Sequence, residues 1–266
     1  MGESEQNHEH REHSLEQTEL ALQNARPLLE ARLEQLSNPF HNRKHVEEVV
    51  QRVQEFLNNL ANPDILNDKQ KLLLHESAFR HDDGHSGNTY RQEVVDDGLS
   101  NEEYAVALLK QDVQDTISGE DFHFMKDHIL ATSFGQNDLE KLPADKKRYY
   151  RPYKPETGTQ KLLAFADAAN YAKGWDAWLE QHWHLLEESP QNTPSTIDAW
   201  IAGEVGFVHT YLSPMLESLQ QLFTPEYFRQ LQHDLQIHLQ KLVALKEVSN
   251  SERNKIENKL TQFRES

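Results

Sequence analysis

Apolar residues recur at the three- to four-residue spacing of one helix face along most of the chain, and strand-like alternation is scarce. A first stretch, 15–36, contains Pro27, which predicts either one bent helix or a pair of helices. Further stretches with this period are 46–57, 72–78, 104–109 and 162–171. The pattern therefore predicts an all-α protein.

Turn-forming segments separate the predicted helices. They are found at 62–63, 81–88, 118–119, 135–138 and 190–194. Because there is no internal repeat and no clear linker, we expect one compact multi-helix domain over 14–248, with 15–36 as an N-terminal helical extension. A polar, His-rich tail at 1–13 is expected to be disordered, and 249–266 is predicted to form a charged C-terminal helix.

Near the C-terminus a long apolar stripe predicts a further amphipathic helix. Its members are Phe228, Leu231, Leu235, Leu239, Leu242, Val243 and Leu245. Ile237 falls outside the stripe. Such a stripe most often packs on its own domain, and the alternative is the seam of a homodimer.

Composition narrows the classes of function. The formal net charge of −17 disfavours nucleic-acid polymers and anionic membrane surfaces as partners. The absence of cysteine leaves imidazole and carboxylate as metal ligands, and the chain has 15 histidines. With neither a basic start followed by an apolar run nor about 18 uninterrupted apolar residues, we expect a cytoplasmic protein.

One segment, 141–154, departs from the acidic average. Its charged and aromatic members are Lys141, Lys146, Lys147, Arg148, Tyr149, Tyr150, Arg151, Tyr153 and Lys154. It precedes the predicted helix that carries Asp167. This basic loop either attracts phosphate to the mouth of a site or is an ordinary solvated connection.

Imidazole and carboxylate groups gather in short segments beside the predicted helices. His41 and His45 are four residues apart and share a face if helical. His81 and Asp82 cannot share a helix face, but at a helix end both can reach one ion. Asp167 lies in an apolar run, where an unpaired carboxylate would be costly without a cation.

These residue types suit a hard divalent ion, and the two oxygens of Asp82 allow it to bridge two ions. A single His or Asp in a helical protein is usually a surface group or a satisfied hydrogen-bond partner. The conjunction of His-x-x-x-His, His-Asp-x-x-His and an Asp within an apolar helix is what favours a metal site over that interpretation.

With these motifs the chain resembles the HD-domain metal-dependent phosphohydrolases, and within them the catalytic domain of class I cyclic-nucleotide phosphodiesterases. Residues 40–45 resemble the family's Tyr-His-Asn-x-x-His, and 81–88 resemble His-Asp-x-x-His-Pro-Gly. Further similar segments are 101–103, 130–132, 166–170 and 204–207. The likeness spans roughly 40–217 and implies an all-α hydrolase of phosphoesters.

The resemblance also implies a metal site with two divalent ions, whether zinc, magnesium, manganese or iron. The ligands of the first ion would be His45, His81, Asp82 and Asp167, with Asp82 bridging to the second. A metal-bridged hydroxide would then attack phosphorus.

Four further residues receive catalytic roles from the resemblance. His41 would be the general acid that protonates the leaving oxygen. His85 and Glu103 would orient waters on the second ion, and Glu187 would hydrogen-bond His41 and keep it protonated.

Substrate contacts would come from Asn170, Glu204 and Phe207, which would line and stack on a nucleotide base. Where the family has glutamine, this chain has Glu204, and an ionised carboxylate can only accept hydrogen bonds. Guanine, with two donors on its Watson–Crick edge, would fit that carboxylate better than adenine. The alternative for Phe207 is ordinary core packing.

Three other functions remain open at this point. One is an HD-type nucleotide phosphomonoesterase or a phosphohydrolase with another substrate. Another is a di-iron oxygenase on the same scaffold, for which His85 is a candidate extra ligand and no second is obvious. The last is a regulatory module that keeps the fold without turnover.

Overall fold

The computed structural model describes residues 14–87, 99–113, 116–133, 153–247 and 251–265. The predicted tail at 1–13 lies outside them. So does the basic loop at 141–154, apart from Tyr153 and Lys154.

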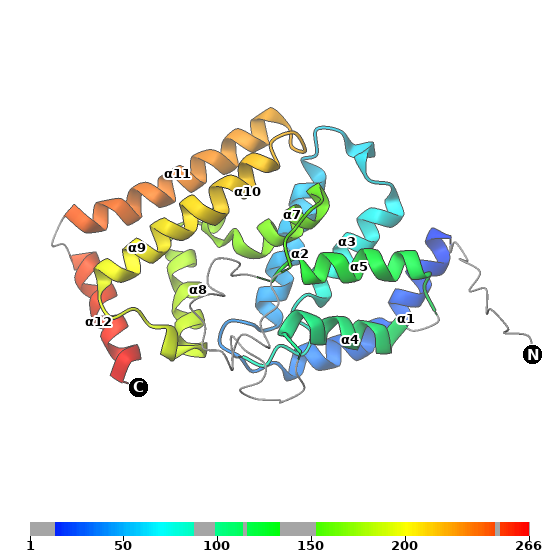
Figure 1. Ribbon diagram of the computed structural model, residues 1–266, viewed down its shortest axis with the longest axis horizontal. Helices are drawn as coiled ribbons and strands as arrows, with labels where there is room; N and C mark the ends of the chain where they lie inside the picture. The colour runs from blue at the N-terminus through cyan, green and yellow to red at the C-terminus, as the bar shows by residue number, and fades with distance from the viewer. Residues whose placement is uncertain (1–13, 88–98, 114–115, 134–152, 248–250, 266) are drawn as a thin grey trace, which may run out of the picture.

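The described residues form an all-α domain, as predicted, with no strand among them (Figure 1). The N-terminal half contains α1 (Leu15–Gln35), α2 (Arg43–Asn58), α3 (Asp68–Arg80), α4 (Asn101–Val113) and α5 (Gly119–Leu130). The C-terminal half contains α7 (Gly158–Ala168), α8 (Trp175–Glu188), α9 (Ile197–Phe207), α10 (Ser213–Ser218), α11 (Pro225–Glu247) and α12 (Ser251–Glu265). Short 3₁₀ segments are η1 (Pro63–Ile65), η4 (Asn170–Lys173) and η5 (Pro190–Asn192), and a π-helical turn, η6 (Val208–Leu212), joins α9 to α10.

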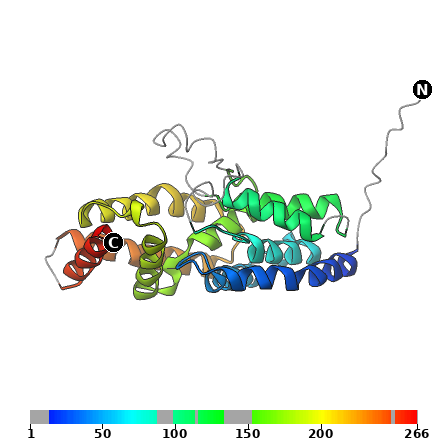
Figure 2. The same cartoon turned by 90° about the horizontal axis from the view of Figure 1, so that it is seen from below.

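Two groups of helices meet at α2 and α7. In Figure 1 helices α1, α3, α4 and α5 lie on one side of this pair, and α8 to α12 lie mainly on the other. Figure 2 shows α4 and α5 in one layer above α1 and α3. Because α2 packs on both α3 and α7, residues at the ends of these three helices are brought together.

The apolar faces predicted from the sequence form the interior. The main cluster extends from Val49 and Val53 of α2 through Phe165 of α7 to the C-terminal helices. A second cluster joins α1 to α3, α4 and α5 through residues such as Leu22 and Met125. Of the two alternatives predicted for this stretch, a single helix is found, and α1 continues through Pro27.

The C-terminal stripe packs on its own domain. Five of its members on α11 are buried in the main cluster: Phe228, Leu231, Leu235, Leu242 and Leu245. Val243 is exposed, as is Ile237, which was expected outside the stripe. The following helix α12 adds Ile256 and Leu260 to the same cluster. Over the described ranges no helix combines the length and apolarity needed to cross a bilayer.

Candidate metal centre

Four side chains converge where α2 begins and α3 and α7 end. His45 lies in the first turn of α2, whose start is fixed by the Asn42 side chain accepting the His45 backbone N–H. His81 and Asp82 follow the last residue of α3, and Asp167 lies in the last turn of α7. All four are buried. Helix ends thus bring together residues from remote parts of the chain.

The donor atoms of these four residues surround one point. His45 Nε2 lies 3.0 Å from Asp167 Oδ1 and 3.4 Å from Asp82 Oδ2. His81 Nε2 lies 3.2 Å from Asp82 Oδ2 and 3.5 Å from Asp167 Oδ1. The two imidazole Nε2 atoms are 3.4 Å apart. Such spacings suit neighbouring ligands of one ion with bonds of about 2.0–2.2 Å.

Two observations show that the residues fit a cation. His81 donates its Nδ1–H to the Ala78 carbonyl at 2.8 Å, which directs Nε2 toward the cluster as the nitrogen that would bind an ion on losing its proton. Asp82 Oδ2 is buried and has no hydrogen-bond partner among the described residues. A buried carboxylate oxygen without a hydrogen bond is costly unless a cation or proton satisfies it.

A second group of donors shares Asp82 with the first. His41, Asp82 and His85 present ligand atoms within 4.8 Å of one another, as do His45, His81 and Asp82. The rings of His41 and His85 are stacked with centroids 3.7 Å apart. Asp82 therefore stands between two donor groups, which is where a carboxylate that bridges two ions would have to lie.

The carboxylate that binds His41 is Glu188, and the prediction of Glu187 is wrong. Glu188 Oε1 bonds His41 Nδ1, and Oε2 accepts the backbone N–H groups of Phe40 and His41 at 3.0 and 2.9 Å. Glu187 is exposed and lies 3.6 Å from His184. One residue along a helix turns the side chain by about 100°, so Glu187 and Glu188 cannot share a target.

The charged groups at the centre influence one another's ionisation. Burial opposes ionisation of Asp82 and Asp167, but the neighbouring histidines, His81 above all, hold the pKa of each carboxyl well below its usual range. Burial also opposes protonation of His41, yet Asp82 and Glu188 outweigh it and raise the pKa of that imidazole. The centre thus favours ionised carboxylates beside a protonated His41.

Helix α4 carries the predicted Glu103 and, beside it, Glu102. Glu103 accepts hydrogen bonds from the Ser100 backbone at 3.0 Å and the Tyr153 hydroxyl at 2.9 Å. Burial raises the pKa of Glu102, and the charges of Asp82 and Asp167 add to that effect. Next to Glu102, the Asn101 amide Nδ2 lies 2.9 Å from His85 Nε2, a contact that the motifs did not predict.

The three residues predicted to bind a base lie on η4 and α9. Asn170 begins η4, and its Oδ1 is buried with no hydrogen-bond partner among the described residues. Glu204 Oε1 lies 3.6 Å from His182 Nδ1, and burial raises the pKa of Glu204 to about 7. Phe207 is 36% exposed and stacks on Tyr211, so the core-packing alternative does not describe it.

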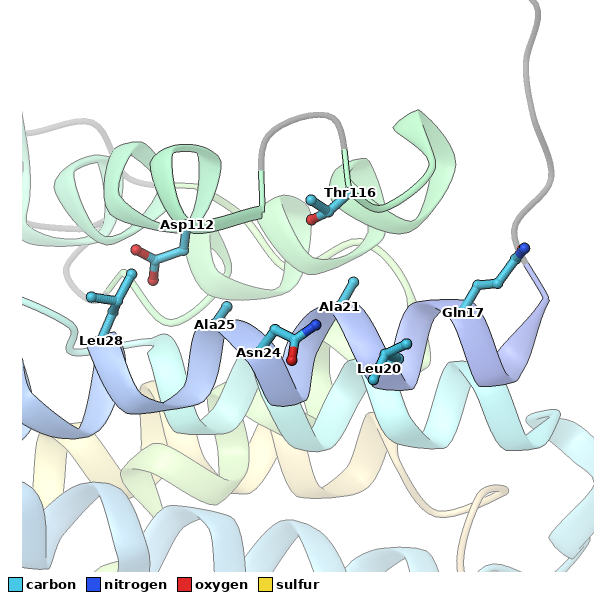
Figure 3. A pocket seen from close by; sticks show the side chains of 8 residues that line it. All are labelled: Gln17, Leu20, Ala21, Asn24, Ala25, Leu28, Asp112 and Thr116. Carbon is cyan, nitrogen blue, oxygen red and sulfur yellow. The ribbon is translucent and has the colours of Figure 1, made fainter.

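A cavity of about 370 Å³ lies elsewhere, between α1 and α4 (Figure 3). It is lined by Gln17, Leu20, Ala21, Asn24, Ala25, Leu28, Asp112 and Thr116. None of the candidate metal ligands or base-binding residues is among them. This cavity is therefore separate from the metal centre.

Comparison with known proteins identifies the fold. No family model matches the chain, and no curated protein matches it. Among solved structures, the phosphodiesterase domain of the RhoPDE fusion protein from the choanoflagellate Salpingoeca rosetta is similar with a TM-score of 0.59 and 18% identity, covering 86% of each chain. LmjPDEB1 in complex with IBMX has a TM-score of 0.61 and 15% identity, covering 85% of this chain and 80% of that one.

A further structure, the phosphodiesterase domain of Salpingoeca rosetta rhodopsin phosphodiesterase, has a TM-score of 0.60 and 20% identity, covering 92% of this chain and 84% of that one. The chain therefore has the helical fold of phosphodiesterase catalytic domains, and the predicted resemblance is confirmed at the level of the fold. The buried His and Asp groups described above could hold metal in this fold.

Proposed function

We propose that this protein is a metal-dependent phosphodiesterase that hydrolyses a cyclic nucleotide or a related nucleotide phosphodiester. The observation that carries the proposal is the pair of donor groups that share Asp82, in the fold of phosphodiesterase domains. A shared carboxylate suits in-line displacement at phosphorus, because both the attacking and the leaving oxygen need stabilisation. The protonated His41 would face the second position as a proton donor, and Asp82 and His85 would remain there for the ion and its waters.

In this proposal His45, His81, Asp82 and Asp167 hold the first ion, and Asp82 also reaches the second. A bound divalent pair would supply a water of lowered pKa and neutralise charge on the phosphoryl oxygens. The protein's part is to present ionised carboxylates and neutral imidazole Nε2 atoms in a fixed arrangement. The hydrogen bond from His81 Nδ1 to Ala78 does this for one ligand.

His41 would be the general acid. Its Nδ1 is engaged by Glu188, so Nε2 is the nitrogen that can deliver a proton to the leaving oxygen. Glu188 is itself fixed by two backbone N–H groups, which holds the imidazole in one orientation. A carboxylate that orients a histidine and stabilises its charged form is a recurring device in acid–base catalysis.

Asn170, Glu204 and Phe207 would contact the base. The exposed ring of Phe207 offers a surface for stacking. When ionised, Glu204 would accept from the two donors on the Watson–Crick edge of guanine, and when protonated it could both donate and accept, as glutamine does. We therefore expect guanine to be preferred where Glu204 is ionised.

The test is a hydrolysis assay of the protein loaded with Mn²⁺, Mg²⁺ or Zn²⁺ against cyclic nucleotides, nucleoside mono- and triphosphates and generic phosphodiesters. Turnover of a phosphodiester that is lost on chelation and restored by metal supports the proposal. His233→Gln, at an exposed histidine on α11, which carries no candidate site residue, is the control and should retain activity. Metal-loaded protein that hydrolyses no member of the panel would refute the proposal.

A further inference from the structure

The residues immediately before and after His81 and Asp82 belong to one chain of ion pairs. Arg80 precedes the two candidate ligands, and Asp83 follows them. Arg80 donates to Asp112 of α4 at 2.7 Å. Arg32 of α1 joins Asp112 to Asp83, which makes the order Arg80, Asp112, Arg32, Asp83. We call these four residues the clamp.

Arg32 binds both aspartates of the clamp. Its Nε and Nη2 donate to the two oxygens of Asp83 at 2.8 and 2.6 Å. Its Nη1 and Nη2 donate to the two oxygens of Asp112 at 3.1 and 2.5 Å. A planar guanidinium that binds two carboxylates through both oxygens of each restricts their rotation as well as their position.

The two clamp residues that flank the candidate ligands are buried. The side chains of Arg80 and Asp83 are fully buried and that of Asp112 is 2% exposed, whereas that of Arg32 is 24% exposed. Buried ion pairs often contribute little to stability relative to apolar side chains of similar size, since desolvation offsets the attraction. The effect of the clamp on the position of the neighbouring ligand atoms is therefore distinct from its effect on the stability of the fold.

The backbone between Arg80 and His85 forms a tight turn that the clamp holds at two points. Asp83 N–H donates to the Arg80 carbonyl at 3.0 Å, and His85 N–H donates to the Asp82 carbonyl at 3.0 Å. Gly84 has φ of +71°, and a Cβ there would lie 2.6 Å from the Tyr104 ring. Asp82 lies inside this turn, directly between a backbone held at Arg80 and one held at Asp83.

We infer that Arg32 is a positioning residue, which through Asp83 and Asp112 fixes the turn that presents His81 and Asp82 to metal. This inference rests on the proposed function in taking Asp82 as a metal ligand. It assigns helix α1 a part in the metal centre, although α1 supplies no candidate ligand. Loss of Arg32 should therefore weaken metal binding beyond what its effect on stability explains.

The chain provides a matched control. Arg26, also on α1, pairs with Glu76 of α3 and lies over the Phe79 ring. Its side chain is 23% exposed and that of Glu76 is 5% exposed, values close to those of Arg32 and Asp83. The Arg26 pair thus joins α1 to α3 itself, whereas the Arg32 pairs join α1 to α4 and to the turn that carries the candidate ligands.

The experiment compares Arg32→Gln with Arg26→Gln in the full chain. Mn²⁺ affinity is measured by calorimetry on metal-free protein, and the melting temperature is measured for each variant. We expect both variants to lower the melting temperature and only Arg32→Gln to weaken Mn²⁺ binding, by about 10- to 100-fold, as when groups behind metal ligands are removed. Equal Mn²⁺ affinity of the two variants would overturn the inference.

Two additions keep the result interpretable. Arg32→Lys keeps the charge but cannot bind both carboxylates through paired N–H groups, so we expect intermediate Mn²⁺ affinity, and this variant replaces Arg32→Gln if the latter does not fold. Metal binding by the wild-type protein distinguishes a failure of the proposed function from a failure of the role inferred for Arg32. Wild-type protein that binds no Mn²⁺ would refute the proposed function together with this inference, whereas unchanged binding in the Arg32 variants would refute the inference alone.

Discussion

The metal centre and the predicted base-binding region differ in how closely the fold defines them. At the centre, the Nε2 atoms of His45 and His81 lie within 3.5 Å of the oxygens of Asp82 and Asp167, and all four residues are buried. In the base-binding region, Glu204 lies 3.6 Å from His182, and Phe207 is 36% exposed. Under the proposed function, the groups that would hold metal lie buried at packed helix ends, whereas those that would contact a base lie at a more open surface.

Removing a ligand carboxylate should have the largest effect. Asp82→Ala or Asp167→Ala leaves buried imidazoles without their anionic partners and takes an oxygen ligand from the ion. We expect near-complete loss of hydrolysis and of stoichiometric metal, measured by assay and elemental analysis. If Asp167→Ala kept full metal content, Asp167 would not be a ligand.

Changes at His41 and at Glu188, which binds it, should have the next largest effect on hydrolysis. His41→Ala is expected to lower kcat by about 10²- to 10⁴-fold with metal content retained, as for the loss of a general acid. Glu188→Gln should lower kcat less, because the His41 ring remains, but the amide does not stabilise its charged form and has one acceptor oxygen for the Nδ1–H and the two backbone N–H groups. Glu187→Gln is the matched control, and a kcat defect as large as that of Glu188→Gln would contradict the assignment.

A smaller effect is expected on base choice. Glu204→Gln restores both a donor and an acceptor at this position, so the ratio of kcat/KM for guanine over adenine cyclic nucleotides should fall. Measurement at pH 8, where the native carboxylate is mainly ionised, gives the clearest contrast. An unchanged ratio would show that Glu204 does not determine base preference, and it would leave the proposed metal ligands unaffected.

The smallest predicted effect is on stability. Burial raises the pKa of Glu204 to about 7, above its value of 4.5 in the unfolded chain. Its contribution to stability is therefore fully present below pH 4.5 and lost as the pH rises through 7. Glu204→Gln should raise the melting temperature by a few degrees at pH 8 and much less at pH 4, as measured by thermal denaturation. Equal shifts at both pH values would argue against the raised pKa.

The all-α fold followed from the sequence, which also singled out the histidines and aspartates that lie together at the helix ends. Apolar periodicity indicates helices directly, and the short motifs of His41 to His45 and His81 to His85 keep their ligands within one turn or one bend. Asp167 could be singled out because a carboxylate in an apolar run requires a partner. These signals are local, so one chain is enough to find them.

Two kinds of contact could not be predicted in this way: those that depend on which face of a helix a residue occupies, and those between residues far apart in the sequence. Glu187 was expected where Glu188 is found, since the start of α8 fixes which of two adjacent glutamates faces His41. The Arg32 contact to Asp83 joins residues 51 positions apart, and no spacing rule links an arginine in α1 to a turn after α3. Only the packed structure brings such residues together.

The central claim is that His45, His81, Asp82 and Asp167 bind a common metal ion. The most direct measurement is anomalous diffraction from crystals of the full chain loaded with Mn²⁺. We expect an anomalous peak within bonding distance of all four side chains. A fully loaded crystal with no peak there, or with manganese bound only at other histidines, would contradict it.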